Sequence, residues 1–443
     1  MRDTAPSPGA LELARAAAAA VDGERVIALT RRLVQTRSVV DAAPADPAEP
    51  SGGRATPNGP TTAAATEAAC ADVVAEELRA AGFEPTVQEV APGRPNVICD
   101  WAGSGFDPAR HRTLMFEGHT DVVTEGDPAR WTHPPFGAEL VEAADGQRLY
   151  GRGSADMKGG VAAAIVALEA LRHTAPELPG RVRLGIVVDE EGMMLGIKDF
   201  IARGWADEVD AAIVCEPEEL ELCLVQKGAM RLHVHVHGVM AHGAMPYAGV
   251  NPIAGLTRFL AGVEALQGAE QARVGAHEHL GLPWCTPTIV RAPVQGEAQL
   301  NVMPGRAYAA LDVRTVPGQD HDRLFEQLRA AADDVAADVP GLRIELDWFE
   351  DRPWTETPAT DPLVRALEDA YPLVFARAPR YGGVPGATDG TFLRASAGVP
   401  IVTVGPGDRT IPHQVDEFVR TADLITAARL YAAAAALYLA GPA

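Results

Sequence analysis

The feature that most constrains the fold of this chain is a change in its strand pattern near residue 226. Before this point, short apolar runs at Thr113–Phe116, Arg181–Val188 and Ala211–Cys215 alternate with helical segments. Such runs are typical of strands that are buried on both faces of a parallel sheet. After it, Arg231–His237 (RLHVHVH) alternates strictly between polar and apolar residues, as an antiparallel strand with one buried face does. The sequence therefore predicts two different sheets.

The elements after residue 226 predict a small two-layer α+β unit. They follow the order strand, helix, two strands, helix, strand, at residues 231–237, 252–266, 298–302, 307–313, 322–337 and 343–349. A helix at 363–371 and a buried strand at 400–404 then resume the first pattern. The smaller unit is thus predicted to be inserted into a larger α/β domain, in which helices flank a mostly parallel sheet. We expect the larger domain over residues 1–225 and 350–443 and the inserted domain over 226–349.

The N-terminal part is expected to be mainly helical. Helices are predicted within residues 1–40 and over Thr62–Ala81, with Gly82 as a C-cap. Between them, Asp41–Pro60 is rich in Pro, Gly, Ala and Asp and is expected to be a surface loop or insertion. No signal peptide or membrane span is expected in this segment, because Leu11–Val21 is alanine-rich and interrupted by charges.

Charge and cysteine content limit the partners and the compartment. The 443 residues carry a formal charge of −22, which argues against nucleic acid or an anionic membrane as a partner. The five cysteines are odd in number, scattered and without a Cys-x-x-Cys pair. This pattern does not predict a disulfide framework, and it favours a cytoplasmic location.

Acidic residues and histidines stand just past the ends of the predicted strands. In open α/β sheets, sites form at the carboxyl ends of strands, so these side chains are expected to meet at one edge. A further carboxylate, Asp156, lies in a glycine-dense run (GRGSADMKGG, 151–160) that precedes a predicted helix at 161–172. The strand-end residues are His119, Asp121, Glu190, Glu191, Glu216 and His413.

These residue types fit a site for more than one metal ion. Two imidazoles and three carboxylates hold a pair of zinc ions if one carboxylate, here Asp156, bridges them. Asp121 stands two residues after His119 and is placed to accept the other N–H of its ring. The adjacent side chains of Glu190 and Glu191 diverge, so one can bind metal while the other acts as general base.

Taken together, the motifs resemble a known metallopeptidase family. HTDVV (119–123), GRGSADMKGG (151–160), DEEG (189–192), CEP (215–217) and PHQVDE (412–417) are similar to motifs of acetylornithine deacetylase, succinyl-diaminopimelate desuccinylase, aminoacylase and the glutamate carboxypeptidases. They span most of the chain in the family's order. The resemblance implies a phosphorylase/hydrolase-like catalytic domain with an inserted lid and dimerisation domain.

The resemblance also implies roles for the site residues. It places His119, Asp156 and Glu216 on one zinc ion, and Asp156, Glu191 and His413 on the other. Glu190 takes the place of the general base, which deprotonates the attacking water and later gives the proton to the leaving amine. Zn²⁺ is the expected metal, with Co²⁺ or Mn²⁺ as alternatives, since such sites bind several divalent ions.

Four residues resemble the family's substrate-contacting positions. His242 (AHGAMP) matches a lid histidine that reaches into the partner subunit's site and donates to the oxyanion, which implies a homodimer. Asn301 and Arg314 match lid residues that contact a substrate carboxylate. A structural salt bridge is the alternative role for Arg314. Gly386 corresponds to a glycine-rich substrate loop, here interrupted by Val384 and Pro385.

Other candidate residues are given structural roles. The histidines at 233, 235 and 237 are expected on the polar face of one strand, with its apolar residues buried opposite. His277 and His279 are expected to be solvated in a loop. Cys215 is expected in the core rather than as a nucleophile.

The predicted function is hydrolysis of the amide bond of an N-acyl amino acid by a zinc-activated water. The segment from CEP to QKGAMRLHVHVHG resembles the acetylornithine and succinyl-diaminopimelate branch more than the aminoacylases. A carboxypeptidase or dipeptidase of the same family is the alternative within this class. A metal-binding homologue without activity is the alternative of another class, and the presence of Glu190 argues against it.

Overall fold

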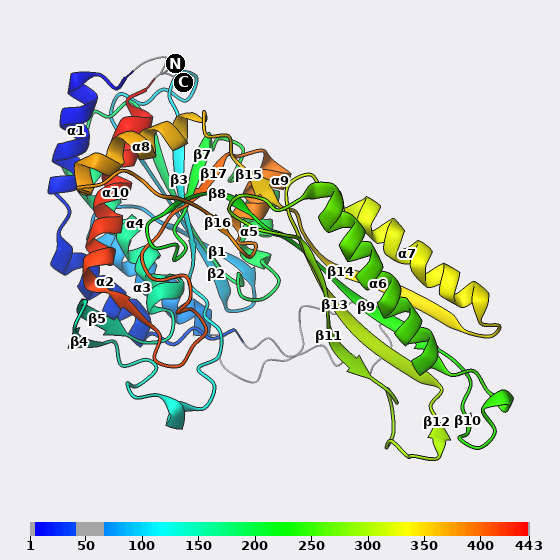
Figure 1. Cartoon of the computed structure of the whole chain (residues 1–443). Coiled ribbons are helices and arrows are strands. Elements are labelled where there is room, and N and C mark those ends of the chain that lie inside the picture. Colours follow the sequence, from blue (N-terminus) through cyan, green and yellow to red (C-terminus); the bar gives the residue numbers. More distant parts are fainter. Residues whose placement is uncertain (1–4, 41–65, 442–443) are drawn as a thin grey trace.

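The computed structural model describes residues 5–40 and 66–441, and the predicted loop at 41–60 lies outside them. The larger part of the chain forms an α/β unit (Figure 1). Residues 228–352 form a separate, elongated α+β unit, here called the small unit. The domain boundaries at 226 and 349 stay predictions.

The larger unit is built on a nine-stranded sheet. Along the sheet the strands lie in the order β1-β2-β6-β3-β7-β17-β8-β15, and β16 pairs with β8. Their bounds are β1 (Thr86–Ala91), β2 (Arg94–Ala102), β3 (Thr113–His119), β6 (Arg181–Val187), β7 (Ala211–Val214), β8 (Leu222–Gln226), β15 (Thr355–Glu356), β16 (Tyr381–Val384) and β17 (Ile401–Thr403). A separate three-stranded sheet contains β4 (Glu139–Ala143), β5 (Gly146–Tyr150) and β18 (Phe418–Arg420).

The sheet is parallel in its centre, and β16 adds one further parallel pair, with β8. Strands β6, β3, β7 and β17 run parallel to their neighbours in this group, whereas β1, β2, β8 and β15 add antiparallel pairs on either side. The α/β fold class is therefore confirmed, with a mixed sheet. Because the four central strands are parallel, their carboxyl ends meet at one edge of the sheet.

Helices cover both faces of this sheet. They are α1 (Pro8–Ala19), α2 (Gly23–Gln35), α3 (Thr66–Ala80), α4 (Gly159–Thr174), α5 (Leu195–Ala202), α8 (Pro362–Val374), α9 (Gly390–Ala397) and α10 (Thr421–Leu439). Buried residues of α5 and α9 form the core on one face, and the other six helices contribute to the core on the opposite face. Short turns of other helix types occupy Pro128–Arg130, Ser154–Lys158 and Pro246–Ala248.

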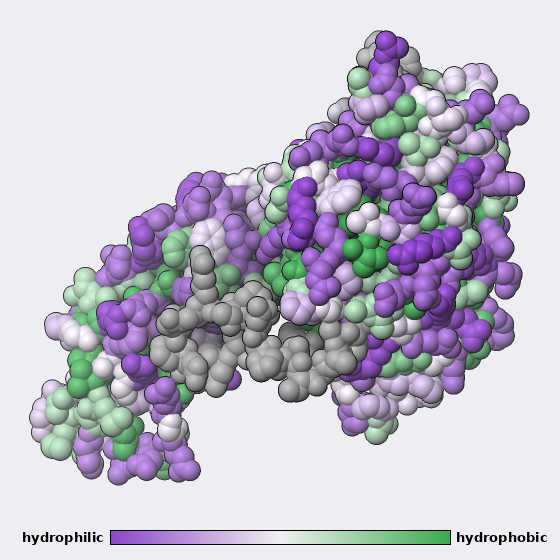
Figure 2. Space-filling view, turned by 180° about the vertical axis from the view of Figure 1, so that it is seen from behind, coloured by the Kyte–Doolittle hydropathy of each residue, from purple (hydrophilic) through white to green (hydrophobic). Residues whose placement is uncertain are grey.

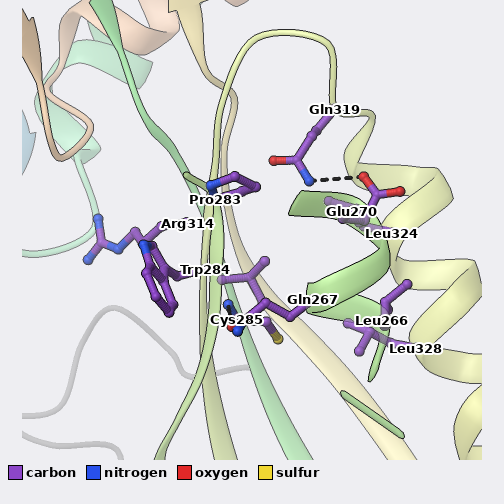
Figure 3. A pocket seen from close by; sticks show the side chains of 11 residues that line it. Leu266, Gln267, Glu270, Pro283, Trp284, Cys285, Arg314, Gln319, Leu324 and Leu328 are labelled. Atoms are coloured by element: carbon purple, nitrogen blue, oxygen red, sulfur yellow. Dashed lines mark hydrogen bonds between the residues drawn. The ribbon is translucent and has the colours of Figure 1, made fainter. Parts of the chain in front are cut away.

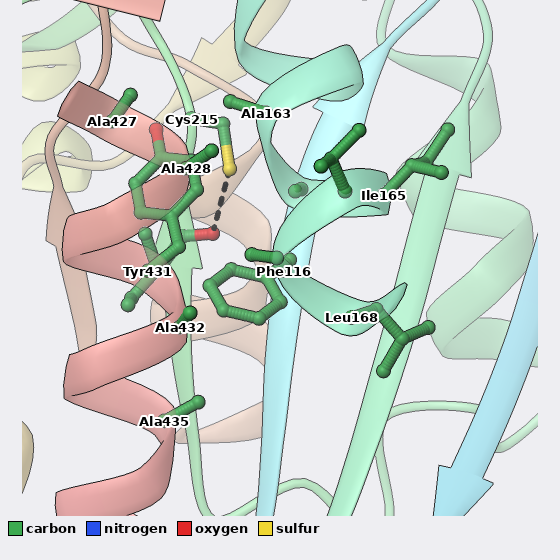
Figure 4. Packing of buried hydrophobic residues seen from close by; sticks show 14 of the residues in the cluster. Phe116, Ala163, Ile165, Leu168, Cys215, Ala427, Ala428, Tyr431, Ala432 and Ala435 are labelled. Carbon is green, nitrogen blue, oxygen red and sulfur yellow. Dashed lines mark hydrogen bonds between the residues drawn. The ribbon is translucent and has the colours of Figure 1, made fainter. Parts of the chain in front are cut away.

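The C-terminal helix α10 is the centre of the larger core. Figure 4 shows its alanines facing α4, with Tyr431 beside Phe116 of β3. The two rings lie 5.3 Å apart, and the Tyr431 hydroxyl donates to the Val404 carbonyl oxygen at 2.6 Å. Cys215 lies in the same cluster, as expected, and burial raises the pKa of its thiol. By length and composition alone α10 could cross a membrane, but 72% of its most apolar window is buried inside the molecule.

The small unit packs two helices on one face of a four-stranded antiparallel sheet. The strand order is β11-β13-β9-β14, so β11 and β14 are the edges. The elements are β9 (Gly228–His237), α6 (Pro252–Val274), β11 (Trp284–Arg291), β13 (Arg306–Thr315), α7 (His321–Asp338) and β14 (Arg343–Arg352). At the far tip, β10 (Ala241–His242) pairs with β12 (Val302–Met303).

The predicted order of elements in this unit is right, but one strand was misplaced. The predicted strand at 298–302 is wrong, because Ala298–Asn301 form an exposed turn and only Val302 belongs to a short strand. The second strand is instead β11, whose side chains are largely exposed. Helix α6 also runs to Val274, beyond the predicted end at 266.

The three histidines of β9 lie on the face of the small sheet opposite the helices. His233, His235 and His237 are partly exposed, while the alternate apolar residues of the strand are buried against α6 and α7. His233 stacks on Phe349 at 4.2 Å and its Nδ1 lies 2.6 Å from the Tyr308 hydroxyl. These partners agree with a structural role for the histidines.

Candidate metal centre

The central parallel strands bring most of the predicted ligands to one edge of the sheet. His119 is the last residue of β3 and not, as predicted, a residue after it. Glu191 follows β6, Glu216 follows β7, and His413 lies in the loop between β17 and β18. Asp156 belongs to the irregular turn Ser154–Lys158 that leads into α4.

His119 lies between two carboxylates. Its Nε2 atom is 3.3 Å from Asp156 Oδ1 and 3.5 Å from Glu216 Oε1. This nitrogen is buried and has no hydrogen-bond partner among the described residues. The Nδ1 atom is 2.9 Å from the main-chain carbonyl oxygen of Asp121. In the neutral ring the proton therefore sits on Nδ1, and the lone pair of Nε2 faces the carboxylates, which is the tautomer a metal ligand needs.

A second group lies on the other side of Asp156. His413 Nε2 is 3.3 Å from Asp156 Oδ2 and 3.0 Å from Glu191 Oε1. Asp156 thus offers one oxygen to each group, and the ligand atoms within each group lie within 4.8 Å of one another. Zinc–ligand bonds of about 2.0–2.1 Å place the ligand atoms of a tetrahedral ion about 3.3 Å apart. The observed separations agree with that geometry.

The three carboxylates of this site favour the binding of cations. Burial raises the pKa of Glu216 to about 7. Burial acts to raise the pKa of Asp156, but the neighbouring imidazoles of His119 and His413 outweigh it and hold that pKa below its ordinary value. The pKa of His413 is raised to about 11 by its hydrogen bonds to Asp156 and Glu191. The carboxylates therefore hold protons on imidazoles that would otherwise be neutral, and divalent ions would supply the same positive charge. The donor set fits a pair of metal ions.

Asp121 accepts hydrogen bonds through both its main-chain carbonyl and its carboxylate, from different partners. Asp121 is the partner of His119 Nδ1, as expected, but its carbonyl oxygen accepts the N–H, while the carboxylate Oδ1 is 3.6 Å away. The carboxylate accepts the backbone N–H groups of Glu190 at 3.2 Å and Glu191 at 3.0 Å. Asp121 therefore ties the His119 ring to the loop that carries the two glutamates.

Glu190 is buried beside the two ligand groups but belongs to neither. Burial raises the pKa of its carboxyl well above the ordinary value, and neighbouring Glu216 adds to this effect while His119 opposes it. The preceding residue, Asp189, has a positive φ of 67° and accepts the N–H groups of Met193 and Leu195. Of the two glutamates that follow, only Glu191 belongs to a ligand group, and Glu190 is left for the predicted role of base.

The loop of the two glutamates is also bonded to the strand that ends the small unit. Arg352, at the end of β14, donates from Nη2 to the Gly192 carbonyl oxygen at 2.8 Å. The same arginine pairs with Glu350, which Arg231 of β9 contacts at 2.7 Å. Two ion pairs and one hydrogen bond therefore connect strand β9 of the small unit to the loop that carries Glu190 and Glu191.

The predicted substrate-contacting residues are not all gathered at this centre. His242 and Asn301 lie together at the tip of the small unit, where Gly243 N–H donates to the Asn301 carbonyl oxygen at 2.7 Å (Figure 1). Arg314 lies at the other end of the small sheet and is held by both oxygens of Asp312, at 2.6 and 3.0 Å. Gly386 is half-buried, and no atom would obstruct a side chain there.

A pocket in the small unit is separate from the metal centre. It lies between the sheet and the two helices, and its lining is mostly apolar around Cys285 and Leu328 (Figure 3). Burial raises the pKa of the Cys285 thiol to about 12, so this sulfur is not a ready nucleophile. Arg314 and Trp284 point out of the other side of the sheet in the same view.

Two residues that support Asp156 escaped the sequence analysis. Glu417 is fully buried and accepts the backbone N–H groups of Ala155 at 3.0 Å and Asp156 at 3.2 Å. Its other oxygen pairs with Arg152. Arg152 lies in the motif GRGSADMKGG and Glu417 in the motif PHQVDE, and these positions were the only sign in the sequence that the two residues belong near the site.

Comparisons with known proteins agree with this site. Residues 115–437 match the sequence profile of the peptidase family M20/M25/M40. The chain is 31% identical over 376 residues to succinyl-diaminopimelate desuccinylase of Methylibium petroleiphilum, covering 82% of this chain and 92% of that protein.

Solved structures of the family share the fold. A metallo-carboxypeptidase of Sulfolobus solfataricus superposes with a TM-score of 0.71 at 18% identity, over 94% of this chain and 99% of that one. A dinuclear metal-binding peptidase of Bacillus subtilis gives a TM-score of 0.66 at 18% identity, over 94% and 98%. The profile and the identity over most of both sequences, together with the paired ligand groups, show that this chain belongs to peptidase family M20/M25/M40 and is a metal-dependent hydrolase of amide bonds.

Proposed function

We propose that this chain is a two-zinc deacylase that hydrolyses the amide bond of an N-acyl amino acid. The observation that carries the proposal is the pair of ligand groups that share Asp156, with Glu190 buried beside both and bound to neither. Zinc is the first choice because imidazole and carboxylate donors at tetrahedral spacing suit it, and cobalt or manganese can take its place.

The residues around the proposed metal pair have different roles in the reaction. Bound divalent ions supply a Lewis acid for the substrate carbonyl and lower the pKa of water. Glu190 accepts the proton of the attacking water and passes it to the leaving amine, a role that suits a carboxyl whose pKa is raised by burial. Asp121 holds Glu190 in place through the backbone N–H of that residue.

His242 is the proposed donor to the oxyanion. Its Nδ1 accepts the backbone N–H of Ala244 at 3.0 Å, so the neutral ring carries its proton on Nε2. The ring is exposed at the tip, so its Nε2–H is accessible to another molecule. Because this tip is the end of the small unit remote from the large sheet, the ring would serve the site of a second subunit (Figure 1).

Edge strand β11 is the proposed dimer interface. Most of its side chains are exposed, including Trp284, Ile289 and Val290. An exposed edge with apolar residues pairs readily with a second copy of itself around a two-fold axis. Figure 2 shows further apolar surface on the tip of the small unit, which carries exposed Met240 and Tyr247.

The proposed substrate class rests on the relative and on Arg314. The relative of 31% identity is a desuccinylase, which favours N-acyl amino acids. The guanidinium of Arg314 suits a substrate carboxylate, whose two oxygens would replace those of Asp312. A carboxypeptidase or dipeptidase is the second candidate, and the likeness to the Sulfolobus carboxypeptidase favours it.

A substrate panel tests the proposal. The metal-free protein is loaded with zinc, cobalt or manganese and assayed on N-acetyl and N-succinyl amino acids and on dipeptides. We expect the highest kcat/KM on an N-acyl amino acid. Preference for a dipeptide would select the second candidate, and no turnover of any amide by protein with two bound ions would reject both.

A further inference from the structure

The turn that carries Asp156 is not a regular helix. Asp156 and Met157 interrupt it with non-helical backbone angles, φ −116° and −131°. Yet Asp156 must direct Oδ1 to His119 and Oδ2 to His413, each at 3.3 Å. A shared ligand is sensitive to small rotations, since any movement that favours one metal position withdraws an oxygen from the other.

Glu417 binds the backbone of this turn directly. One carboxylate oxygen accepts the N–H groups of both Ala155 and Asp156. The Glu417 carbonyl oxygen also accepts the N–H of Gly151, at 2.8 Å, at the start of the glycine-rich run. The side chain therefore fixes the peptide groups on both sides of Ala155 and with them the position of the Asp156 Cα atom.

Arg152 in turn fixes Glu417. Its Nη1 pairs with the second carboxylate oxygen, and its Nη2 donates to the Thr124 carbonyl oxygen at 3.3 Å. The guanidinium also lies over the Trp131 ring at 5.3 Å. Arg152 and Glu417 are both buried, so the pair is shielded from water and holds one geometry.

The same segment also carries a metal ligand. His413 and Glu417 are four residues apart, and between them Asp416 accepts the N–H of Thr132 at 2.7 Å, which anchors the loop. A shift of this loop would therefore move His413 and the support of Asp156 together.

We infer that Glu417 is the positioning residue of the bridging ligand Asp156, and that Arg152 acts through it. The inference rests on the proposed two-metal function and extends it to residues that contact no metal. Hydrogen-bonding partners of this kind orient ligands, and their loss weakens metal binding about 10- to 100-fold.

Cobalt titration of the full-length, metal-free protein tests this inference. The variant is Glu417→Gln, which keeps the shape of the side chain but removes its charge and one acceptor oxygen. The matched control is Glu77→Gln on α3, because Glu77 is a largely buried carboxylate of the same unit that pairs with Arg25 and Arg32 and belongs to neither ligand group. The measurements are the affinities for Co²⁺, the visible absorption spectrum of bound cobalt, and the melting temperature without metal.

The two variants are expected to differ in cobalt binding. Both should lower the melting temperature, but only Glu417→Gln should weaken cobalt binding, by about 10- to 100-fold, and alter the cobalt spectrum. A cobalt affinity and spectrum like those of wild type in folded Glu417→Gln would overturn the inference, while the proposed function would stand. Failure of the wild-type protein to bind two cobalt ions would instead reject the proposed function.

A second variant covers the case in which Glu417→Gln does not fold. Arg152→Lys keeps the positive charge beside Glu417 but loses the fork that binds it and the Thr124 carbonyl. It should bind cobalt several-fold more weakly and show an altered spectrum. A folded Arg152→Lys protein with the cobalt affinity and spectrum of wild type would contradict the inference.

Discussion

Asp121 illustrates how the main chain organises the ligands of this site. Its carbonyl oxygen selects the tautomer of His119, and its carboxylate holds the backbone of Glu190 and Glu191. Asparagine at this position keeps one acceptor oxygen but presents an N–H₂ group to the second backbone donor. Asp121→Asn should therefore displace both glutamates and reduce kcat or metal affinity about 10- to 100-fold. Steady-state kinetics and chelator competition would measure this, and wild-type values in both would contradict the role.

Removal of the proposed general base should reduce turnover but leave metal binding unchanged. Glu190→Gln should reduce kcat about 10²- to 10⁴-fold, because no group then accepts the proton of the attacking water. Since Glu190 belongs to neither ligand group, two metal ions per chain should remain, as elemental analysis would show. Glu142→Gln, on exposed strand β4, is the control and should behave as wild type. Turnover that survives in Glu190→Gln would mean that another group is the base.

The residues of the metal centre were largely predictable because they lie in short motifs at strand ends. His119, Asp156, Glu191, Glu216 and His413 all occur in the two groups that the structure brings together. The pairing of Arg152 with Glu417 was not predicted, because their motifs suggested a metal site but did not indicate which of the other charged residues in these motifs contact each other.

Strands were predicted correctly where polar and apolar residues alternate, and an exposed edge strand without such alternation was missed. Strand β9 alternates in sequence and in burial, so it was predicted correctly. Strand β11 was missed because an exposed edge has no buried face to mark it, and Pro287 interrupts it. Helix α10 was not predicted: it is alanine-rich and buried on most sides, so no polar face marks its period.

Helix α6 is held near its C-terminus by a charged group whose effect depends on pH. Glu270 accepts two hydrogen bonds from Arg273, at 2.6 and 2.9 Å. It also accepts one from Gln319, in the loop before α7, at 3.0 Å (Figure 3). The bond from Arg273, followed by that from Gln319, lowers the pKa of Glu270 below its usual 4.5 against the effect of burial. Such a group stabilises the folded state above pH 4.5, and this contribution is lost as the pH falls through the lower folded-state value.

Glu270→Gln should therefore lower the free energy of unfolding at pH 7 by about 1–3 kcal/mol. The difference from wild type should shrink as the pH falls below 4.5, the pKa that Glu270 has when unfolded. Urea denaturation at several pH values would measure it. Glu326→Gln, which removes an exposed pair with Arg329, is the control and should change stability by less than about 1 kcal/mol. A Glu270→Gln difference that is constant with pH would contradict the assignment.

For the whole molecule, the exposed edge of the small unit predicts assembly. Val290→Glu places a charge on edge strand β11, where the partner strand would lie, so light scattering should show a monomer. Its kcat should fall to that of His242→Ala, because the histidine of the second subunit is then absent. Val87→Glu, an exposed valine of β1 at the edge of the large sheet, is the control and should leave both properties unchanged. A Val290→Glu protein that is monomeric and fully active would rule out a shared site.

The central claim is that Asp156 lies between two cations, and anomalous diffraction from crystals of the zinc-loaded protein tests it most directly. We expect two zinc peaks per chain, about 3.5–4 Å apart. One should contact His119 and Glu216, the other Glu191 and His413, and both should contact Asp156. A single peak, or two peaks of which only one contacts Asp156, would contradict the account.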